Sequence, residues 1–370
     1  MKCSARRMMF VALSLLVLCL GTGCDELMPV ADAGDDRVVA IQAQVTLDGS
    51  KSTGYAPLSY QWELEAPNGS LAVLEGANTI NPTFTPDLPG RYTARLVVSI
   101  ELNNEVLQSE PDEQRITAAA ANQCLYRPLP RSNPKARIFC FGYAGQGAQI
   151  YDPWLDYLDE DVELVSIMFP GRFNRADEEP FTRLSDVVDE VLHDMAPYTD
   201  VPYVIFGHCM GALIGFELAD RLEEEGEPLP SHLVMSGTPA AHLPVYTTRP
   251  SLHDASDAAI VAFSLMVGLI DLDMAIHMNQ HADFFARLRT DFEMVDTWTY
   301  TDGMRVNLPM TAMGSANDMA ASTEDIIAWQ EVTDGPFSHH IFKGKHFFIH
   351  SERKAVLAVI NDILSGVTAD

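Results

Sequence analysis

The sequence predicts two domains of different class, a small all-β domain followed by a larger α/β domain. A length of 370 residues suits two domains. Between residues 29 and 119, short runs alternate apolar and polar residues and are separated by Gly, Pro and Asp, which is typical of antiparallel strands. Over residues 204–219, an apolar strand passes through a glycine-flanked turn into a mostly apolar helix, which is typical of an α/β domain. We place this second domain at residues 135–370.

The amino terminus has the composition of an export signal. Three basic residues among the first seven precede an apolar run, residues 8–20, that is too short to cross a bilayer. The Gly-Thr-Gly-Cys sequence ending at Cys24 resembles a bacterial lipobox, which implies lipid attachment to Cys24. We expect a signal peptide at residues 1–23, a tether at 24–28 and an exported, membrane-anchored lipoprotein in the periplasm or on the cell surface. Simple cleavage and an uncleaved anchor stay open as alternatives.

The strands predicted between the tether and the α/β domain resemble a known module. Runs such as 45–52, 58–62 and 90–98 are similar to those of a PKD repeat, an immunoglobulin-like module common on bacterial surface proteins, over residues 29–119. The resemblance implies a β-sandwich with Trp62 as a core aromatic residue. Its role is either adhesion or that of a passive spacer, since a fold does not imply a function. Residues 120–134 are predicted to form a linker.

The most informative motif is Gly207-His208-Cys209-Met210-Gly211, which has the spacing of a G-x-S-x-G nucleophile elbow with sulfur in place of oxygen. In such an elbow a strand turns sharply into a helix, and glycines relieve crowding around the strained nucleophile. The preceding apolar run and the following helix stand in the required order. Cys209 is therefore the candidate nucleophile. A buried small side chain in a glycine-rich turn is the alternative reading.

An elbow nucleophile needs a base and an acid that orients the base, and in α/β-hydrolases both follow it in the order acid, then histidine. The apolar stretch 308–313 predicts a late strand, and Asp318 lies in the loop just after it. Farther on, His346 follows a short strand and a turn. These positions predict a Cys209, His346 and Asp318 triad in an α/β-hydrolase fold.

From about Cys124 to Leu364 the chain resembles a type II thioesterase, the stand-alone editing hydrolase that accompanies non-ribosomal peptide and polyketide synthases. The matching segments are spread in order along the chain: 137–145, 169–175, 207–211, 228–237, 291–293, 335–337 and 344–348. Three departures from the family pattern stand near the chemistry. They are Cys209 for serine, Gly142-Tyr143 for Pro-His, and Gln146 for the second glycine of an early loop.

The resemblance implies further parts of the site. The oxyanion hole would be formed by the backbone N–H groups of Met210 and Ala144, which bind the charge that develops on the substrate oxygen. A helical lid over the acyl pocket would occupy about residues 240–298, which are rich in Leu, Met and Phe at helical spacing. A plain core helix pair is the alternative for this stretch.

A thiol in the elbow changes the expected chemistry. A free cysteine has a pKa of about 8.5, which a neighbouring imidazole or a helix N-terminus lowers, so Cys209 could rest as a thiolate beside His346. Attack on a thioester would then be close to an isoenergetic exchange of thiols. The acyl-cysteine could be resolved by water or by another acceptor. Hydrolysis and acyl transfer therefore both stay open.

The net charge of the chain limits the kinds of molecule that it is expected to bind. The chain has 24 Lys and Arg against 52 Asp and Glu, a net charge of −28, with no basic run outside the signal, which argues against nucleic acid. The implied substrate is an acyl thioester or ester, and a phosphopantetheine-linked acyl group is one candidate. The membrane is an expected partner only through the lipid on Cys24. An acidic carrier protein would be repelled, and an exported enzyme would not meet cytosolic carriers, so this partner is uncertain.

Neither a cofactor nor a metal is expected. His277 and His281 lie one helical turn apart but lack the intervening glutamate of a zinc-hydrolase helix. Of the cysteines that remain after export and lipid attachment, Cys209 must stay reduced, and Cys124 with Cys140 is a pair that the sequence leaves open.

Three functions remain in view. The first is a thioesterase or esterase with the triad named above, the second an acyltransferase with the same residues, and the third a catalytically inactive surface adhesin. Dependence of the product on an acceptor separates the first two. A failure to form any acyl-cysteine supports the third.

Overall fold

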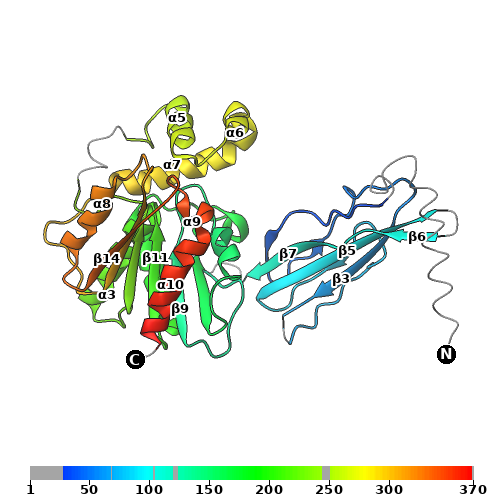
Figure 1. Ribbon diagram of the computed structural model, residues 1–370, viewed down its shortest axis with the longest axis horizontal. Coiled ribbons are helices and arrows are strands. Elements are labelled where there is room, and N and C mark those ends of the chain that lie inside the picture. The colour runs from blue at the N-terminus through cyan, green and yellow to red at the C-terminus, as the bar shows by residue number, and fades with distance from the viewer. Residues whose placement is uncertain (1–27, 68, 103–104, 120–123, 244–250, 369–370) are drawn as a thin grey trace. The chain divides into compact units, whose positions relative to one another are not determined.

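The computed structural model describes residues 28–67, 69–102, 105–119, 124–243 and 251–368, which divide at Ala118 into two compact units (Figure 1). Within these ranges, no helix has both the length and the hydropathy needed to cross a bilayer. The predicted signal peptide and Cys24 lie outside the described residues. Each unit has its own hydrophobic core.

All the secondary structure described between residues 28 and 119 is β-strand. One sheet has the strand order β1-β7-β5-β3, with β6 paired to β5, and a second sheet pairs β2 with β4 (Figure 1). The pairs that β5 makes with β3, β6 and β7 are antiparallel. The strands are Arg37–Ala40 (β1), Val45–Thr46 (β2), Ser59–Glu65 (β3), Thr83–Phe84 (β4), Gly90–Leu102 (β5), Glu105–Gln108 (β6) and Asp112–Ala119 (β7).

The core of this first unit follows the two-residue period of its strands. In β5 every second side chain from Tyr92 to Val98 is buried, because successive side chains of a strand point to opposite faces. Trp62 of β3 joins this core and is 2% exposed, as the sequence predicted. Side chains from both sheets meet there. The relation of this unit to PKD repeats stays a prediction.

The second unit is built on a seven-stranded sheet with the order β14-β13-β12-β11-β9-β10-β8. All neighbouring strands are parallel except the edge strand β8, which runs antiparallel to β10. The strands are Leu125–Tyr126 (β8), Ala136–Phe141 (β9), Val162–Ile167 (β10), Tyr203–His208 (β11), His232–Ser236 (β12), Met310–Ser315 (β13) and Phe337–Phe342 (β14).

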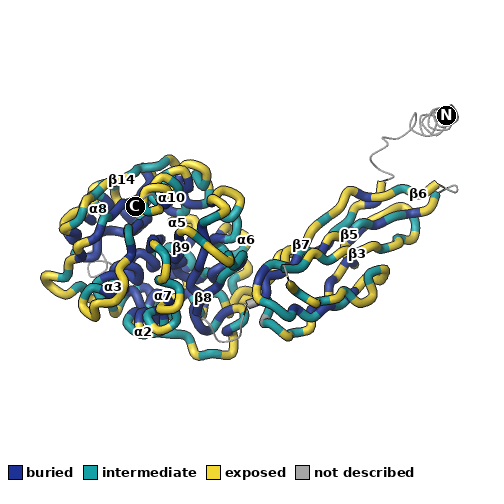
Figure 2. Tube along the Cα trace, turned by 90° about the horizontal axis from the view of Figure 1, so that it is seen from below, coloured by how far each residue is buried: buried dark blue, intermediate teal, exposed yellow. Residues whose placement is uncertain are grey.

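Helices cover both faces of this sheet, so its central strands are buried throughout (Figure 2). In β11, Tyr203 and Ile205 pack into one layer, while Val204 and Phe206 pack into the other. The first layer is covered by Leu184–Met195 (α2), Met210–Glu225 (α3) and Thr323–Ile327 (α8), and the second by Ala148–Trp154 (η2), Phe348–Ser351 (α9) and Arg353–Val367 (α10). Three short 3-10 turns complete this part of the unit: Phe173–Arg175 (η3), Ala196–Tyr198 (η4) and Ala328–Val332 (η6).

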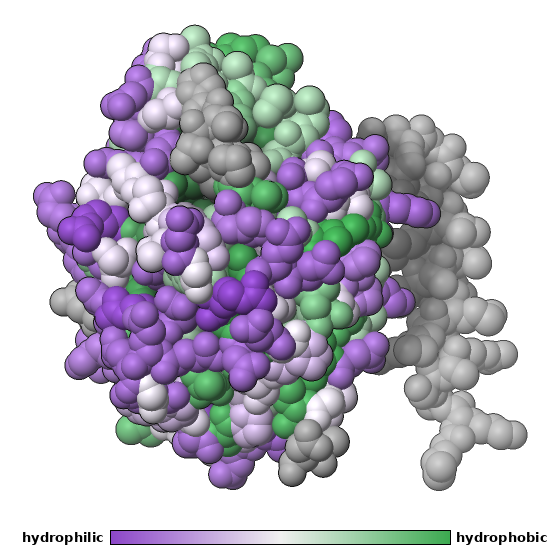
Figure 3. All heavy atoms as spheres, turned by 90° about the vertical axis from the view of Figure 1, so that its left-hand side faces the viewer, coloured by the Kyte–Doolittle hydropathy of each residue, from purple (hydrophilic) through white to green (hydrophobic). Residues whose placement is uncertain are grey.

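A helical insertion stands between β12 and β13, within the predicted lid. It comprises Asp257–Val267 (α5), Leu272–Ile276 (α6), Met278–His281 (η5) and Ala282–Thr297 (α7) (Figure 1). Leu288 and Phe285 of α7 pack into the core beneath, whereas Leu272 and Ile276 of α6 are about two-thirds exposed. On the face in Figure 3, hydrophobic surface gathers at the end that carries the insertion, and hydrophilic residues dominate elsewhere.

Part of the predicted linker, residues 120–134, belongs to the second unit. Leu125 and Tyr126 form the edge strand β8, and Cys124 is fully buried against the core of the second unit. An edge strand of two residues carries too little alternation to be recognised from its sequence. The second unit therefore begins before residue 135.

Cys124 and Cys140 are free thiols and not a disulfide pair. Cys124 packs into one layer of the core and Cys140 into the other, so the sheet separates them. Burial raises the pKa of both thiols. Both cysteines serve as small buried side chains.

Candidate active site

Cys209 lies between the end of β11 and the start of α3, in a strained backbone conformation. Its φ is 54° and its ψ is −119°, a region that residues with a side chain rarely adopt. The Cys209 N–H donates to the carbonyl of Ser236 on the neighbouring strand at 2.8 Å, which helps to hold the turn. The strand, the sharp turn and the helix therefore have the geometry of the elbow that the sequence predicted, and the role of Cys209 as nucleophile stays a prediction.

The two glycines of the elbow are required by close backbone contacts. A Cβ on Gly207 would lie 2.1 Å from the carbonyl oxygen of Gly211, and one on Gly211 would lie 2.2 Å from that of Phe141. Only glycine lets strand β11, helix α3 and strand β9 approach so closely. The G-x-C-x-G spacing is therefore a steric requirement of this turn.

His346 and Asp318 lie together, although 27 residues separate them in the chain. His346 Nδ1 is 2.8 Å from Asp318 Oδ2, and their side chains are 4% and 0% exposed. Cys209 and His346 line the same cavity, close enough for the charge of Cys209 to raise the pKa of His346. Because Asp318 occupies Nδ1, Nε2 is the ring nitrogen left for the sulfur. The hydroxyl of Ser315 donates to the Lys345 carbonyl at 2.8 Å and so ties the histidine loop to β13.

The pKa of His346 is raised from its usual value to about 10. Burial alone lowers this pKa, but the charge of Cys209 and the hydrogen bond with Asp318 outweigh burial. His208, the residue directly before Cys209 in the elbow, behaves differently, because burial lowers its pKa well below the usual value of histidine. The site therefore favours one charged imidazole, His346, next to the sulfur.

Both predicted oxyanion donors, Met210 and Ala144, line the same cavity as Cys209. Within the described part of the chain, neither backbone N–H has a protein acceptor. Such N–H groups are available to a ligand oxygen. Gln146, which replaces a family glycine in this loop, is accommodated because its φ is not positive, whereas Gly145 has a φ of +84°.

Tyr143 replaces the family histidine of the loop and forms a hydrogen bond with a histidine of helix α9. Its hydroxyl lies 2.8 Å from Nε2 of His350, and its ring contacts that of Phe347 at a centroid distance of 4.6 Å. Burial lowers the pKa of His350, so the neutral ring can accept this hydrogen bond. Sequence reasoning missed His350, because no motif relates it to a loop some 200 residues earlier.

The candidate triad opens into an apolar cavity of about 500 Å³. The insertion supplies one wall of it, and the loops after β9, β11, β12, β13 and β14 supply the floor. The lid residues are Leu252, Ala255, Ala259, Phe263, Met266, Val267, Leu269, Phe292 and Val295. Part of the apolar stripe of the insertion is therefore cavity wall and part is core, and its role as a lid stays a prediction.

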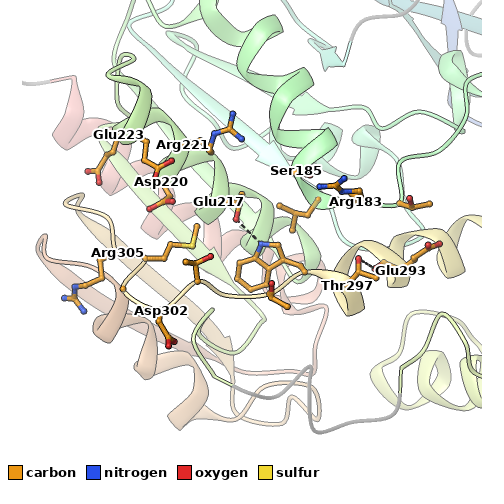
Figure 4. Close-up of a pocket in the computed structure, with 18 residues that line it drawn as sticks. Arg183, Ser185, Glu217, Asp220, Arg221, Glu223, Glu293, Thr297, Asp302 and Arg305 are labelled. Atoms are coloured by element: carbon orange, nitrogen blue, oxygen red, sulfur yellow. Dashed lines mark hydrogen bonds between the residues drawn. The ribbon is translucent and has the colours of Figure 1, made fainter.

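A second cavity, of about 1100 Å³, lies away from the candidate triad between α2, α3 and the segment after α7 (Figure 4). It is lined mainly by polar and charged side chains, among them Glu217, which accepts from the indole of Trp298 at 2.9 Å. Burial and nearby acidic groups raise the pKa of Asp220 to about 6. Among the described residues, no group of three or more His, Cys, Asp or Glu could hold a metal ion.

A mostly parallel sheet with a strained elbow at its carboxyl edge, an aspartate in the loop after β13 and a histidine in the loop after β14 define an enzyme of the α/β-hydrolase type. The model of the thioesterase domain family matches residues 136–364. The chain therefore belongs to the thioesterase family.

Individual relatives agree with this assignment. Gramicidin S biosynthesis protein GrsT of Aneurinibacillus migulanus is 32% identical over 226 residues, 60% of this chain and 86% of that protein. The RedJ thioesterase of the prodiginine pathway of Streptomyces coelicolor is 30% identical, with a TM-score of 0.58 over 64% of this chain and 91% of RedJ. The type II thioesterase BorB of the borrelidin biosynthetic cluster is 26% identical, with a TM-score of 0.60 over 66% of this chain and 99% of BorB.

The steric account of the elbow predicts opposite results for two glycines at helices. Gly211→Ala should lower stability by about 1–3 kcal/mol and remove most turnover, because the new methyl group must displace backbone. Gly366→Ala, at the end of α10, is the matched control, because a Cβ there meets nothing within 4 Å. It should be neutral or stabilising by up to about 1 kcal/mol. Denaturant unfolding and turnover of a model thioester measure both, and similar results for the two variants would contradict the account.

The raised pKa of His346 predicts a coupling to Cys209. Protonated His346 contributes in full to the free energy of unfolding below about pH 6.5, the usual pKa of histidine. This contribution is lost as the pH rises through the raised pKa of about 10. In Cys209→Ala the charge opposite the ring is gone while burial remains, so the pKa should fall. NMR titration of labelled histidine measures this. His232, whose pKa burial lowers to about 4, should titrate alike in both proteins. An unchanged His346 titration would disprove the coupling.

Proposed function

We propose that this enzyme hydrolyses acyl thioesters through an acyl-cysteine formed on Cys209. The observation that carries the proposal is the pair of Cys209 and His346 at the floor of an apolar cavity, with Asp318 hydrogen-bonded to the far side of the imidazole. The reactive form of a cysteine nucleophile is its thiolate, and the raised pKa of His346 favours an imidazolium beside it. The proposal includes this cysteine as nucleophile at a position where the family pattern has serine.

The first half of the reaction follows from this pair. The Cys209 sulfur attacks the thioester carbonyl carbon, and the carbonyl electron pair moves onto oxygen, where the N–H groups of Met210 and Ala144 receive it. Collapse of this intermediate breaks the carbon–sulfur bond to the leaving group. The departing thiolate takes the proton of His346, which leaves an acyl-cysteine and a neutral imidazole.

The second half returns the enzyme to its starting state. The neutral His346 accepts a proton from water as the water oxygen attacks the acyl-cysteine carbonyl, and the carbon–sulfur bond to Cys209 breaks. The products are a carboxylic acid and the thiolate and imidazolium pair. Asp318 keeps Nδ1 occupied throughout, so that Nε2 faces the reacting atoms.

The acyl group is proposed to be apolar, because the cavity beside Cys209 is lined largely by Leu, Val, Phe, Met and Ala side chains. Thioesters fit a cysteine nucleophile, since one thiolate replaces another. GrsT, RedJ and BorB are named for gramicidin S, prodiginine and borrelidin biosynthesis. By analogy, we propose a phosphopantetheine-linked acyl group of a secondary-metabolite assembly line as the substrate class.

The cellular setting is a separate proposal. Export and lipid attachment at Cys24 rest on residues outside the described ranges. An exported enzyme would meet free phosphopantetheine-linked thioesters and not cytosolic carrier proteins. Assays with carrier-bound and free thioesters therefore test the setting, and a strong preference for the carrier-bound form would contradict export. Transfer of the acyl group to an added amine or alcohol, in place of water, would show up as acceptor-dependent product in the same assays.

The proposed triad predicts a specific pattern of losses. Cys209→Ala and His346→Ala should each lower kcat for a model acyl thioester by several powers of ten, and the double variant should lose no more than either alone. Asp318→Asn should lose less than His346→Ala, because a thiolate already paired with the imidazole needs less help from the acid. Steady-state kinetics and mass spectrometry of the intact protein measure these effects.

The matched control is Cys124→Ala, which removes another cysteine thiol, buried in the core and outside the cavity. It should still acquire the acyl mass at Cys209 and turn over normally. Wild-type turnover in Cys209→Ala, or an acyl mass on any other residue, would refute the proposed function.

A further inference from the structure

The loop that carries the Ala144 donor is anchored by a side chain of the lid. Oδ2 of Asp291, on helix α7, accepts a hydrogen bond of 2.6 Å from the backbone N–H of Gly145. Gly145 directly follows Ala144, and the peptide nitrogen fixed by this bond belongs to the plane that begins at Ala144. The bond therefore limits how Ala144, and with it the proposed oxyanion donor, can rotate.

A buried arginine completes the anchor. Arg172 lies on the segment after β10, and its Nη2 donates to Oδ1 of Asp291 at 2.7 Å. Its Nη1 donates to the carbonyl oxygen of Gln146 at 2.6 Å, and its guanidinium lies over the ring of Phe169. One arginine and one carboxylate thus hold the loop at two consecutive residues, through the N–H of Gly145 and the carbonyl oxygen of Gln146.

Burial makes this arrangement rigid. The side chains of Asp291 and Arg172 are 0% and 2% exposed, so each is the main counter-charge of the other, and either one left alone would be a buried uncompensated charge. Hydrogen bonds to charged groups are also stronger than neutral ones. The loop therefore has little freedom to leave this position while α7 is docked.

Packing joins the same two elements. Gly145 has a φ of +84°, and a Cβ there would lie 2.9 Å from the ring of Phe284, also on α7. Farther along α7, Phe292 and Val295 line the acyl cavity. A single helix therefore forms part of the acyl wall and holds the loop that would receive the substrate oxygen.

We propose that Asp291 and Arg172 are positioning residues that set the oxyanion loop in its active conformation and make this conformation depend on the docked lid. This inference rests on the proposed function, since it assumes that the Ala144 N–H serves the acyl-transfer step. It assigns no contact with substrate to either residue. Their effect should appear in the step that develops charge on oxygen and be absent from reactions of Cys209 that do not.

Two reactions of the same sulfur separate positioning from general disruption. Acylation of Cys209 by a model thioester develops an oxyanion, whereas alkylation by iodoacetamide displaces iodide at a saturated carbon and needs no oxyanion hole. In the full chain, Asp291→Ala should slow acylation about a hundredfold, in line with the effect of losing or misplacing an oxyanion donor. Alkylation should stay within about twofold. Asp291→Asn, which keeps an acceptor oxygen for Gly145, should recover much of the loss.

Glu190→Gln is the matched control. Glu190 pairs with the buried Arg175 on the same segment as Arg172, at 2.6 Å, but has no contact with the oxyanion loop. It should acylate and alkylate like the wild type. Should Asp291→Ala fail to fold, the double variant Arg172→Met/Asp291→Ala removes both buried charges and is judged by the same two rates.

Two results would overturn the inference alone. One is acylation by Asp291→Ala at the wild-type rate, and the other is an equal loss of acylation and alkylation, which would mean a merely structural role. A wild-type protein that forms no acyl-cysteine would instead overturn the proposed function, and this inference with it. The wild-type reaction thus distinguishes the two failures.

Discussion

The hydrogen bond between the His346 imidazole and Asp318, beside Cys209, is the interaction on which the proposed chemistry depends. Burial works against a charged histidine, yet the pKa of His346 is raised to about 10, because the charge of the sulfur and the hydrogen bond with Asp318 outweigh burial. The strained backbone of Cys209 brings the sulfur to the ring, and the two glycines of the elbow make that backbone possible. Asp318 fixes the other side of the imidazole.

Two parts of the second unit, the parallel sheet and the helical insertion, together form the site. The parallel sheet supplies the reactive groups at its carboxyl edge, where the loops after β9, β11, β13 and β14 converge. The insertion between β12 and β13 supplies apolar wall and, through Asp291, an anchor for the oxyanion loop. Burial of both pairs, Arg172 with Asp291 and His346 with Asp318, strengthens these electrostatic contacts, since fewer water molecules compete for them. Chemistry and substrate enclosure therefore share helix α7.

Much of this could be predicted from the sequence, because local patterns encode it. The glycine spacing around Cys209 predicted the sharp turn, and the order of Asp318 and His346 predicted that the two side chains meet. The apolar stripe of residues 240–298 predicted helices beside a cavity. The catalytic roles of these residues stay predictions. The edge strand at Leu125 was missed because two residues carry no periodic signal. The anchor between Asp291 and Gly145 joins positions 146 residues apart, and such a contact is set by tertiary packing, not by any local motif.

The most direct test of the account is to replace the nucleophile by the residue that the family pattern has at this position. If the site is adapted to a thiolate paired with His346, Cys209→Ser should lower kcat/KM for a thioester by at least tenfold, or about 1.4 kcal/mol of barrier, because the hydroxyl must still lose its proton during attack. Oxyester hydrolysis should suffer less. A serine variant that matches or exceeds the wild type on both substrates would contradict the account and make Cys209 a drifted serine.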